Sequence, residues 1–204
     1  LGFASILLIF WLITKGALGY LPPLEELQNP KNKFATEVIS SDMQLLGRYY
    51  RQENRVGVNY EDISPNMINA LIATEDARYY NHTGIDFKSL LRAIIKMGRA
   101  GGGSTITQQL AKQLWSPRAN NIFERALQKP IEWVIAVQLE RYYTKEEILT
   151  MYLNKFDFLN NAVGIKTAAN TYFSKEPKDL NILEAATLVG MCKNPSYFNP
   201  RRFN

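Results

Sequence analysis

Helix-start signals, each followed by apolar residues at helical spacing, are the feature that most constrains the fold of this chain. Ser64-Pro65 combines an N-cap residue with proline at the first helical position. Thr105 with Gln108, and Thr144 with Glu147, have the spacing of capping boxes. Apolar residues three and four apart follow the first of these signals and recur further along the chain. These patterns predict a mainly α-helical fold.

The expected elements follow from these signals and from glycine and proline positions. We expect helices from Ser64 past Ile72, from Asp86 to the glycines at 101–103, from Thr105 to Trp115, through Glu132 to Tyr143, from Thr144 to Leu153, over Gly164–Phe173 and over Asn181–Cys192. Residues 34–60 carry β-branched and aromatic clusters, which predict a strand or a hairpin. The segment Lys155–Val163 is expected to be irregular.

The amino end carries a membrane signal. Leu1–Thr14 is uncharged and apolar, and a second apolar run follows Lys15. A span needs about 20 apolar residues, so the first run alone is short. Lys15 can extend its amine to the interface, however, and Trp11 and Tyr20 lie where interfacial aromatic residues are expected. We predict a transmembrane anchor over 1–21, truncated at its start. The alternatives are a buried core helix and the core of a signal peptide.

Composition narrows the classes of function. A chain of 204 residues can form one sizeable core with a small second lobe. A net charge of +5 permits an anionic partner, such as a phosphorylated substrate or an acidic membrane, without choosing among them. The single cysteine, Cys192, excludes an internal disulfide, and one histidine, His82, makes a structural zinc site a poor hypothesis. We expect His82 to have a structural role.

Glu75 is the first candidate for proton transfer. Ile68, Leu71 and Ile72 precede it by seven, four and three residues, so it lies on the apolar stripe of its helix. A carboxylate there faces a core or the edge of a cleft, which suits a general base. The alternative is a structural ion pair, and spacing alone favours that alternative. Asp76 points about a quarter-turn away and is expected to make local hydrogen bonds.

Glu132 is the second candidate. It follows Pro130 and is expected early in its helix, where the helix N-terminus favours a negative charge. That position alone would explain the residue. Two carboxylates near one site would suit glycosyl chemistry, because one can transfer a proton while the other adjusts the charge at the reacting groups.

A glycine turn before a helix is the third candidate feature. Residues 102–112 read GGSTITQQLAK. Backbone N–H groups and hydroxyls at such a helix start can hold an anion such as phosphate, but the Walker pattern is absent. A capped helix after a glycine turn is common, so this signal is weak by itself. The basic residues clustered in sequence around it are Lys112, Arg118, Arg125 and Lys129.

Five motifs in order are far more specific than any of these features alone. Residues 75–86 (EDARYYNHTGID) resemble the first signature of the peptidoglycan glycosyltransferases (glycosyltransferase family 51), which occur in class A penicillin-binding proteins and as monofunctional transglycosylases. Residues 102–112 match the second signature, and Lys129 with Glu132 fits the short third one. Residues 145–154 (KEEILTMYLN) and the Gly-Ile, Ala-Ala and Tyr-Phe pairs between 164 and 173 are similar to the fourth and fifth.

The resemblance implies a lysozyme-like bilobed helical fold with a small β-hairpin element. It implies polymerisation of lipid II into β-1,4-linked glycan with inversion and release of undecaprenyl pyrophosphate. Glu75 and Glu132 would be catalytic. The residues implied to bind substrate are Asp76, Ser104, Thr105, Thr107, Gln108, Gln109, Lys112, Arg118, Arg125, Lys129 and Asn154. A divalent cation, Mg²⁺ or Mn²⁺, is expected as the only cofactor, with its protein ligands unknown.

The same resemblance implies an organisation and a location. We expect an anchor over 1–21, a connector with a hairpin over 22–60, and a glycosyltransferase domain over 61–204, with a transpeptidase domain following. The protein would cross the cytoplasmic membrane once and place its catalytic domain on the outer, periplasmic face. Its partners would be lipid II, the glycan strand, the membrane and cell-wall synthesis proteins, and not nucleic acid.

Some residues depart from the family pattern. Gln128 stands where the third signature usually has arginine, and Pro130 falls inside that signature. Asn160-Asn161 replaces the glycine or arginine often found before the fifth signature. The loop 116–121 leaves open which of Arg118 and Arg125 binds phosphate. A lysozyme-like glycan-cleaving enzyme and an inactive scaffold that binds lipid II remain the alternatives.

Overall fold

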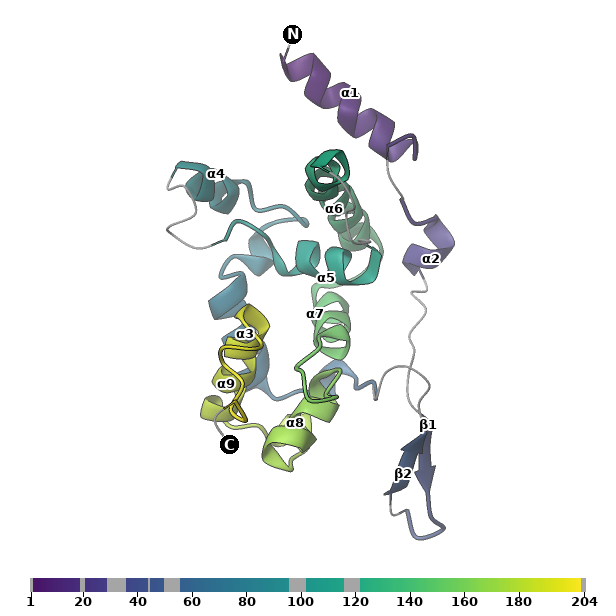
Figure 1. The fold of residues 1–204 in the computed structure, drawn as a ribbon, viewed down its shortest axis with the longest axis vertical. Coiled ribbons are helices and arrows are strands. Elements are labelled where there is room, and N and C mark those ends of the chain that lie inside the picture. Colours follow the sequence, from purple (N-terminus) through teal and green to yellow (C-terminus); the bar gives the residue numbers. More distant parts are fainter. Residues whose placement is uncertain are drawn as a thin grey trace. The chain divides into compact units, whose positions relative to one another are not determined.

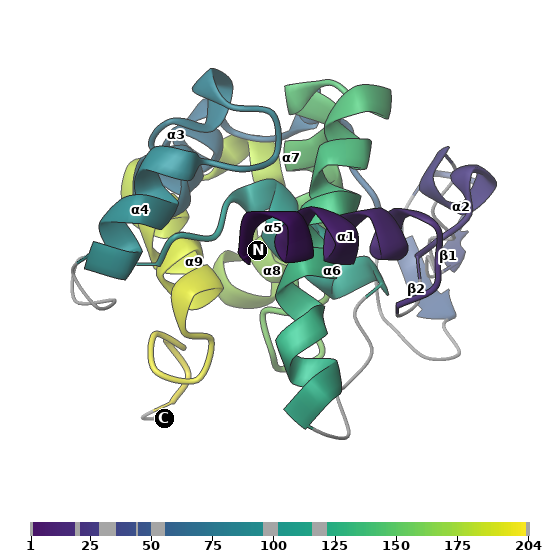
Figure 2. The same cartoon turned by 90° about the horizontal axis from the view of Figure 1, so that it is seen from above.

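The computed structural model describes residues 2–18, 21–28, 36–43, 45–49, 56–95, 102–115 and 122–202. The chain is mainly helical, as predicted (Figures 1 and 2). It divides into two compact units, and neither is continuous in sequence. Unit 1 comprises residues 1–31 and 78–148, and unit 2 comprises residues 32–77 and 149–204.

Unit 1 is built from helices. Its elements are α1 (Gly2–Thr14), α2 (Leu24–Gln28), the 3₁₀ turn η2 (Tyr79–Asn81), α4 (Phe87–Ile95), α5 (Ile106–Trp115), α6 (Ile122–Tyr142) and the start of α7 (Lys145–Lys155). Helices α5 and α6 pack against each other, and the fully buried side chains of Ile106, Leu110, Ile135 and Leu139 lie in this core. Burying an apolar side chain of this size contributes about 1.5–3 kcal/mol, so these four side chains contribute substantially to the stability of the unit.

Helix α2 is tied to this core by two polar contacts. Trp115 Nε1 donates to Glu26 Oε1 over 3.1 Å, and the Tyr143 hydroxyl donates to the carbonyl of Leu27 over 2.7 Å. Leu27 itself is buried. The residues just after the predicted anchor are therefore fixed on the same unit as the second signature.

Helix α1 packs against α6. Phe10 stacks on Trp133 with ring centroids 6.2 Å apart, and Ile13 is fully buried. Leu8 and Trp11 lie on the exposed side, with more than half of their surface accessible. The helix has 13 residues and is shorter than the predicted anchor over 1–21. Among the described residues, no helix has both the length and the apolar character that crossing a membrane requires.

Unit 2 combines the hairpin with the remaining helices. Its elements are β1 (Thr36–Ile39), β2 (Leu45–Tyr49), η1 (Tyr60–Asp62), α3 (Pro65–Glu75), the end of α7, α8 (Ile165–Phe173), η3 (Pro177–Asp179) and α9 (Ile182–Lys193). Strands β1 and β2 pair antiparallel, with a register irregularity between Val38 and Ile39, which confirms the predicted hairpin. Helix α3 packs on α9 and buries Met67, Ile68 and Leu71, the apolar stripe that the sequence indicated.

The start of α3 is fixed by the predicted cap. Ser64 Oγ accepts a hydrogen bond from the Asn66 backbone N–H at 3.2 Å and donates to the carbonyl of Leu180 at 2.8 Å. The Ser64 N–H donates to the carbonyl of Pro177 at 3.1 Å. One residue therefore both starts α3 and attaches it to the segment before α9, which sets the direction in which α3 carries Glu75.

Candidate active site

Glu75 is the last residue of α3 and is half-buried. It lies within electrostatic reach of two buried side chains of unit 2. Burial, and then the neighbouring Cys192 and Glu75, raise the pKa of the Tyr152 phenol above its ordinary range. Burial and the charge of Glu75 raise the pKa of the Cys192 thiol in the same way. Both groups are therefore neutral at physiological pH, so two of the buried side chains near Glu75 carry no charge.

Asp76 ends α3. Its backbone N–H donates to the carbonyl of Ile72 at 3.0 Å, and the residue is only 6% exposed. That bond belongs to the backbone of the helix end, so the expected local hydrogen bonds of the Asp76 carboxylate stay a prediction. The predicted contact between Asp76 and substrate stays a prediction.

Glu132 is buried in unit 1 beside a cation. It is 1% exposed, and Lys129 Nζ, one helical turn earlier on α6, lies 2.6 Å from its Oε2. The same amine donates to Ser104 Oγ at 3.1 Å. Residues of the second and third signatures thus meet in one cluster, the Ser104–Lys129–Glu132 cluster. The Lys129 side chain is 51% exposed, so its charge can also face a bound anion.

The predicted position of Glu132 at a helix start is wrong. Helix α6 begins at Ile122 and continues through Pro130, so Glu132 lies in the middle of the helix. The helix N-terminus is too far away to stabilise its charge, because that effect fades within the first turn. The positive charge of Lys129 stabilises the buried carboxylate instead.

The second signature holds the turn of the first signature. Thr105 Oγ1 and Gln108 Nε2 both donate to the carbonyl of Gly84, at 2.7 and 3.2 Å. The Gln108 N–H donates to Thr105 Oγ1 at 3.1 Å, which is one half of the predicted capping box. The Gln108 side chain is used for Gly84 rather than for the other half of the box. All three residues are buried, so the two signatures form one hydrogen-bonded unit.

Gly84 is required at this contact for two reasons. Its φ is +89°, a conformation that side chains with a Cβ rarely adopt. A Cβ added there would lie 2.8 Å from the carbonyl oxygen of Ala136 on α6. The turn of the first signature is therefore pressed directly against the backbone of the helix that carries Glu132.

A second ion pair joins α6 to the start of α7. Glu140 Oε1 accepts hydrogen bonds from Thr107 Oγ1 at 2.7 Å and from Lys145 Nζ at 2.8 Å. Lys145 Nζ also donates to the carbonyl of His82 at 2.7 Å and lies 4.3 Å from the ring centroid of Tyr79. Lys145 of the fourth signature thereby ties the first signature to α6. The contact to His82 is made by its backbone carbonyl, and a structural role for its imidazole stays a prediction.

Arg78 and Asp86 complete the first signature. Arg78 forms a two-nitrogen ion pair with Asp86, whose Oδ1 also accepts the backbone N–H groups of Lys88 and Ser89 at the start of α4. Burial raises the pKa of Asp86, but the bonds from Arg78 and Ser89 outweigh burial and hold that pKa well below its usual range. Sequence analysis identified Asp86 only as a helix start. The opposite charge of Arg78 in the same motif was the signal for the ion pair.

Asn154 of the fourth signature binds backbone within unit 2. Its Nδ2 donates to the carbonyl of Val58 at 2.9 Å, and its Oδ1 accepts the Val58 N–H at 3.1 Å. Both ends of the amide are therefore used to hold the segment that leads into η1. A direct contact between Asn154 and substrate stays a prediction.

The remaining predicted residues divide between described and undescribed positions. Lys112 is exposed on α5, Gln109 is half-buried, and Thr107 is fully buried against Glu140. Arg118 lies outside the described residues, and only the backbone of Arg125, in α6, is described. The described part of the chain contains no group of three or more His, Cys, Asp or Glu side chains that could hold a metal ion.

Comparison with known proteins identifies the family. A family model described as Transglycosylase matches residues 42–204. The chain is similar to penicillin-binding protein 1A of Pseudomonas aeruginosa, with 38% identity over 185 residues, which cover 88% of this chain and 22% of that protein. It is also similar to penicillin-binding protein 2a of Streptococcus pneumoniae (43% over 143 residues, 70% and 19%) and to penicillin-binding protein 1A of Escherichia coli (37% over 186 residues, 88% and 21%).

The chain spans about a fifth of the length of these relatives. The matched region contains all five sequence motifs, from Glu75 to Phe173, and the two ion pairs in which Glu132 and Glu140 of α6 take part. The chain therefore belongs to the transglycosylase family, the peptidoglycan glycosyltransferases that its motifs resemble.

Proposed function

We propose that this chain polymerises lipid II into glycan strands as a peptidoglycan glycosyltransferase. The observation that carries the proposal is the Ser104–Lys129–Glu132 cluster, in which the second and third signatures meet. The buried Glu132 carboxylate holds the half-exposed Lys129 ammonium beside the Ser104 hydroxyl. This arrangement suits a reaction whose leaving group is a pyrophosphate. The fixed ammonium offsets negative charge as it develops, which is the usual source of electrostatic catalysis.

Glu75 acts as the general base in this proposal. Its carboxylate accepts the proton of the acceptor sugar's 4-hydroxyl as that oxygen attacks C1 of the donor. The new C1–O4 bond forms, the bond from C1 to the pyrophosphate oxygen breaks, and the electron pair leaves with undecaprenyl pyrophosphate. Attack opposite the leaving group converts an α-linked donor into a β-1,4 glycan. A pyrophosphate leaves as a stable anion, so this reaction needs no strong general acid, unlike glycoside hydrolysis.

The charged residues near the second signature have distinct proposed roles. Lys129 binds the pyrophosphate directly, and Lys112 and one of Arg118 and Arg125 add positive charge. Glu132 keeps the Lys129 amine in place. Thr105 and Gln108 hold the turn of the first signature through Gly84, and their effect on substrate is indirect.

A divalent cation remains part of the proposal only as a companion of the substrate. The described side chains do not form a three-ligand site, and Glu132 is already paired with Lys129. We therefore derive no step through a metal bound by the protein alone. Pyrophosphate oxygens are good ligands for Mg²⁺, which binds phosphates together with one or two carboxylates.

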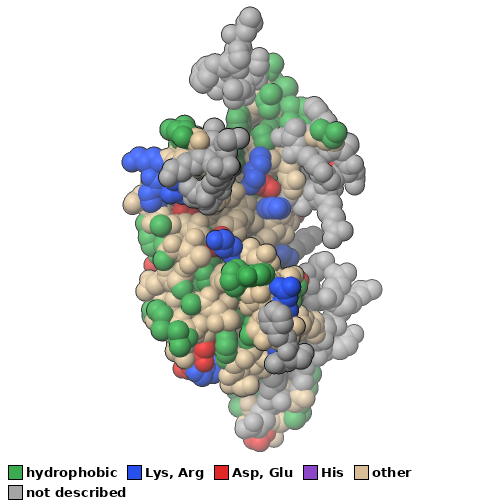
Figure 3. Space-filling view, turned by 60° about the vertical axis from the view of Figure 1, so that its left-hand side comes forward, with side chains coloured by type: hydrophobic (Ala, Val, Ile, Leu, Met, Phe, Trp, Pro, Cys, Tyr) green, Lys and Arg blue, Asp and Glu red, His purple; other side chains and the backbone are tan. Residues whose placement is uncertain are grey.

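We also propose that unit 1 works at a membrane surface, on the outer face of the cytoplasmic membrane. Helix α4 exposes Phe87, Leu91 and Ile95, which are four residues apart and so share one face. Lys88 and Arg92 flank them, and both are exposed. Figure 3 shows hydrophobic and basic side chains interspersed on the face it presents. An apolar helix face with basic neighbours suits the boundary of an anionic bilayer, and the apolar outer side of α1 supports the same location.

The experiment is polymerisation of labelled lipid II by the detergent-solubilised chain, with Glu75→Gln beside it. We expect long glycan from the wild type and a loss of about 10²–10⁴-fold from the variant, the range for a general base. Circular dichroism must show that the variant is folded. Near-normal turnover by a folded Glu75→Gln protein would remove Glu75 from this role. Release of soluble fragments from cell wall would favour a glycan-cleaving enzyme, and lipid II binding without turnover would favour a scaffold.

A further inference from the structure

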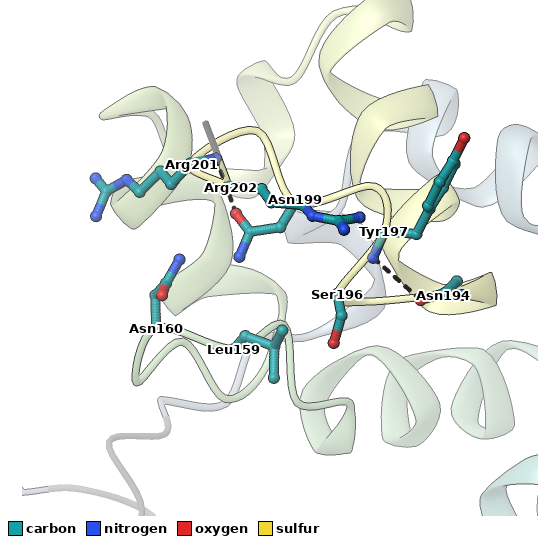
Figure 4. A pocket seen from close by; sticks show the side chains of 8 residues that line it. All are labelled: Leu159, Asn160, Asn194, Ser196, Tyr197, Asn199, Arg201 and Arg202. Carbon is teal, nitrogen blue, oxygen red and sulfur yellow. Dashed lines mark hydrogen bonds between the residues drawn. The ribbon is translucent and has the colours of Figure 1, made fainter. Parts of the chain in front are cut away.

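Unit 2 contains an open pocket that none of the five signatures explains. Its volume is about 560 Å³, within the range of pockets that hold small ligands. Two loops form it, the one between α7 and α8 and the one after α9 (Figure 4). It is lined by Leu159, Asn160, Asn194, Ser196, Tyr197, Asn199, Arg201 and Arg202.

The loop between α7 and α8 holds a strained backbone at this pocket. Leu159, Asn160 and Asn161 have φ values of 62°, 49° and 61°, a left-handed conformation that asparagine tolerates but that is strained for leucine. Asp157 Oδ1 accepts the Leu159 N–H at 2.8 Å, and Asn160 Nδ2 donates to the Tyr172 hydroxyl at 3.1 Å. These bonds hold the loop in this conformation, in which the side chains of Leu159 and Asn160 line the pocket. Strain that neighbours maintain in this way is typical of binding sites.

The pocket presents hydrogen-bond donors. Asn194 Oδ1 accepts the Tyr197 N–H at 3.1 Å, and Asn199 Oδ1 accepts the Arg201 N–H at 2.9 Å. With both carbonyl ends engaged by the backbone, these amides offer their NH₂ groups to a ligand. Figure 4 shows Asn199 directed into the space between the two loops, with Asn160 and Ser196 on either side.

Two adjacent arginines make the pocket positive. The Arg201 guanidinium lies 5.5 Å from the Tyr172 ring centroid and donates one bond to the carbonyl of Thr171. The Arg202 guanidinium lies 5.7 Å from the ring centroid of Tyr197. Stacking on a ring fixes a guanidinium plane, so less entropy is lost when it binds a ligand. Of the described residues that line the pocket, none carries a carboxylate.

A donor-rich, positive pocket of this size selects a ligand with a planar anionic acceptor. A carboxylate matches the two-nitrogen edge of a guanidinium and can also accept from the carboxamide groups. Lipid II, the substrate of the proposed function, carries a pentapeptide on its disaccharide. We propose that this pocket binds the free carboxylate at the end of that peptide, in the substrate or in the glycan product. The inference rests on the proposed function only for the choice of this peptide as the ligand.

The test is calorimetric titration of the chain with a soluble disaccharide-pentapeptide. We expect saturable binding that weakens about tenfold in Arg202→Gln, because a hydrogen bond between charged groups is lost. Asn160→Asp should weaken binding similarly by repulsion, and aspartate tolerates the left-handed conformation as asparagine does. Lys178→Gln removes the same charge from an exposed position of unit 2 outside the lining and should bind as the wild type does.

Two further ligands test whether the terminal carboxylate is the group that binds. The same disaccharide-pentapeptide with its terminal carboxylate converted to an amide should bind at least tenfold more weakly. Inorganic phosphate should not compete at equal concentration. Equal binding of the amide, effective competition by phosphate, or unchanged affinity in both pocket variants would overturn the proposal. Lipid II polymerisation, measured in parallel, tests the proposed function separately, because a chain that polymerises can still fail in this titration and the reverse is also possible.

Discussion

Lys129 and Glu132 share one face of α6, and their charged atoms lie 2.6 Å apart, yet the two side chains differ greatly in exposure. The lysine side chain is 51% exposed and the glutamate side chain 2%. Water can hydrate the ammonium if its partner is removed, whereas the carboxylate would remain buried without a counter-charge. Loss of Lys129 and loss of Glu132 should therefore affect the stability of the fold to different extents.

The two partners can be compared by substitution. Lys129→Met should lower the free energy of unfolding by about 1–3 kcal/mol, because it leaves a buried charge uncompensated. Glu132→Gln keeps the volume and an acceptor, and should cost less than about 1 kcal/mol while slowing polymerisation by about 10²-fold or more. Urea unfolding and lipid II turnover provide the two measurements. Equal losses of stability would contradict the burial argument.

Gly84 offers a prediction about the packing of the first signature on α6. Gly84→Ala should destabilise the fold by about 2 kcal/mol or more, since a positive φ alone costs about 1–2 kcal/mol and the new methyl would meet the Ala136 carbonyl. Gly102→Ala is the matched control, because a Cβ there has no heavy atom within 4 Å. Thermal unfolding of both variants tests this, and similar melting temperatures for the two would argue against it.

Asp86 gives the fold a defined pH dependence. Its pKa in the folded chain is lower than in the unfolded chain, so its carboxylate stabilises the fold fully above the unfolded value of about 4. This contribution decreases as the pH falls from there towards the folded pKa. Asp86→Asn should be less stable at pH 7 and lose less stability on acidification. Melting curves between pH 3 and pH 7 measure this, with the exposed Asp179→Asn as the control.

The exposed face of α4 predicts a membrane contact. Leu91→Asp should leave folding unchanged, since Leu91 is 58% exposed, and should reduce co-sedimentation of the chain with anionic phospholipid vesicles. Leu183→Asp changes an equally apolar and more exposed residue, 75% accessible, at the start of α9 in unit 2. If Leu183→Asp lost binding while Leu91→Asp kept it, α4 would not be the contact surface.

Local signals in the sequence predicted helix starts well. The Thr144–Glu147 capping box is present in both directions, with the Glu147 N–H on Thr144 Oγ1 at 3.2 Å and the Thr144 N–H on Glu147 Oε2 at 2.7 Å. Ser64 caps α3 as predicted. These bonds join residues two or three positions apart, so the sequence alone contains both partners.

Long-range partners changed the predictions that were wrong or incomplete. Gln108 has the spacing for a capping box, but its side chain binds Gly84, 24 residues earlier. Pro130 indicated a helix start, whereas packing against α5 carries α6 through it. The left-handed conformation of Leu159 was not predicted, because leucine rarely adopts it; a local bond to Asp157 and the bond from Asn160 to Tyr172, twelve residues later, accompany it. Glu140 was also missed, since its partners Thr107 and Lys145 come from separate elements.

Ser64 and Leu180 are hydrogen-bonded although 116 residues separate them. A chain that emerges from a ribosome or a translocase amino end first exposes Ser64 long before Leu180 is made. Helix α3 therefore cannot pack on α9 until α9 has also emerged, and its apolar stripe stays uncovered until then. The interval between the two is a period in which a chaperone could bind this stripe, and in which Glu75 has no fixed position to act from.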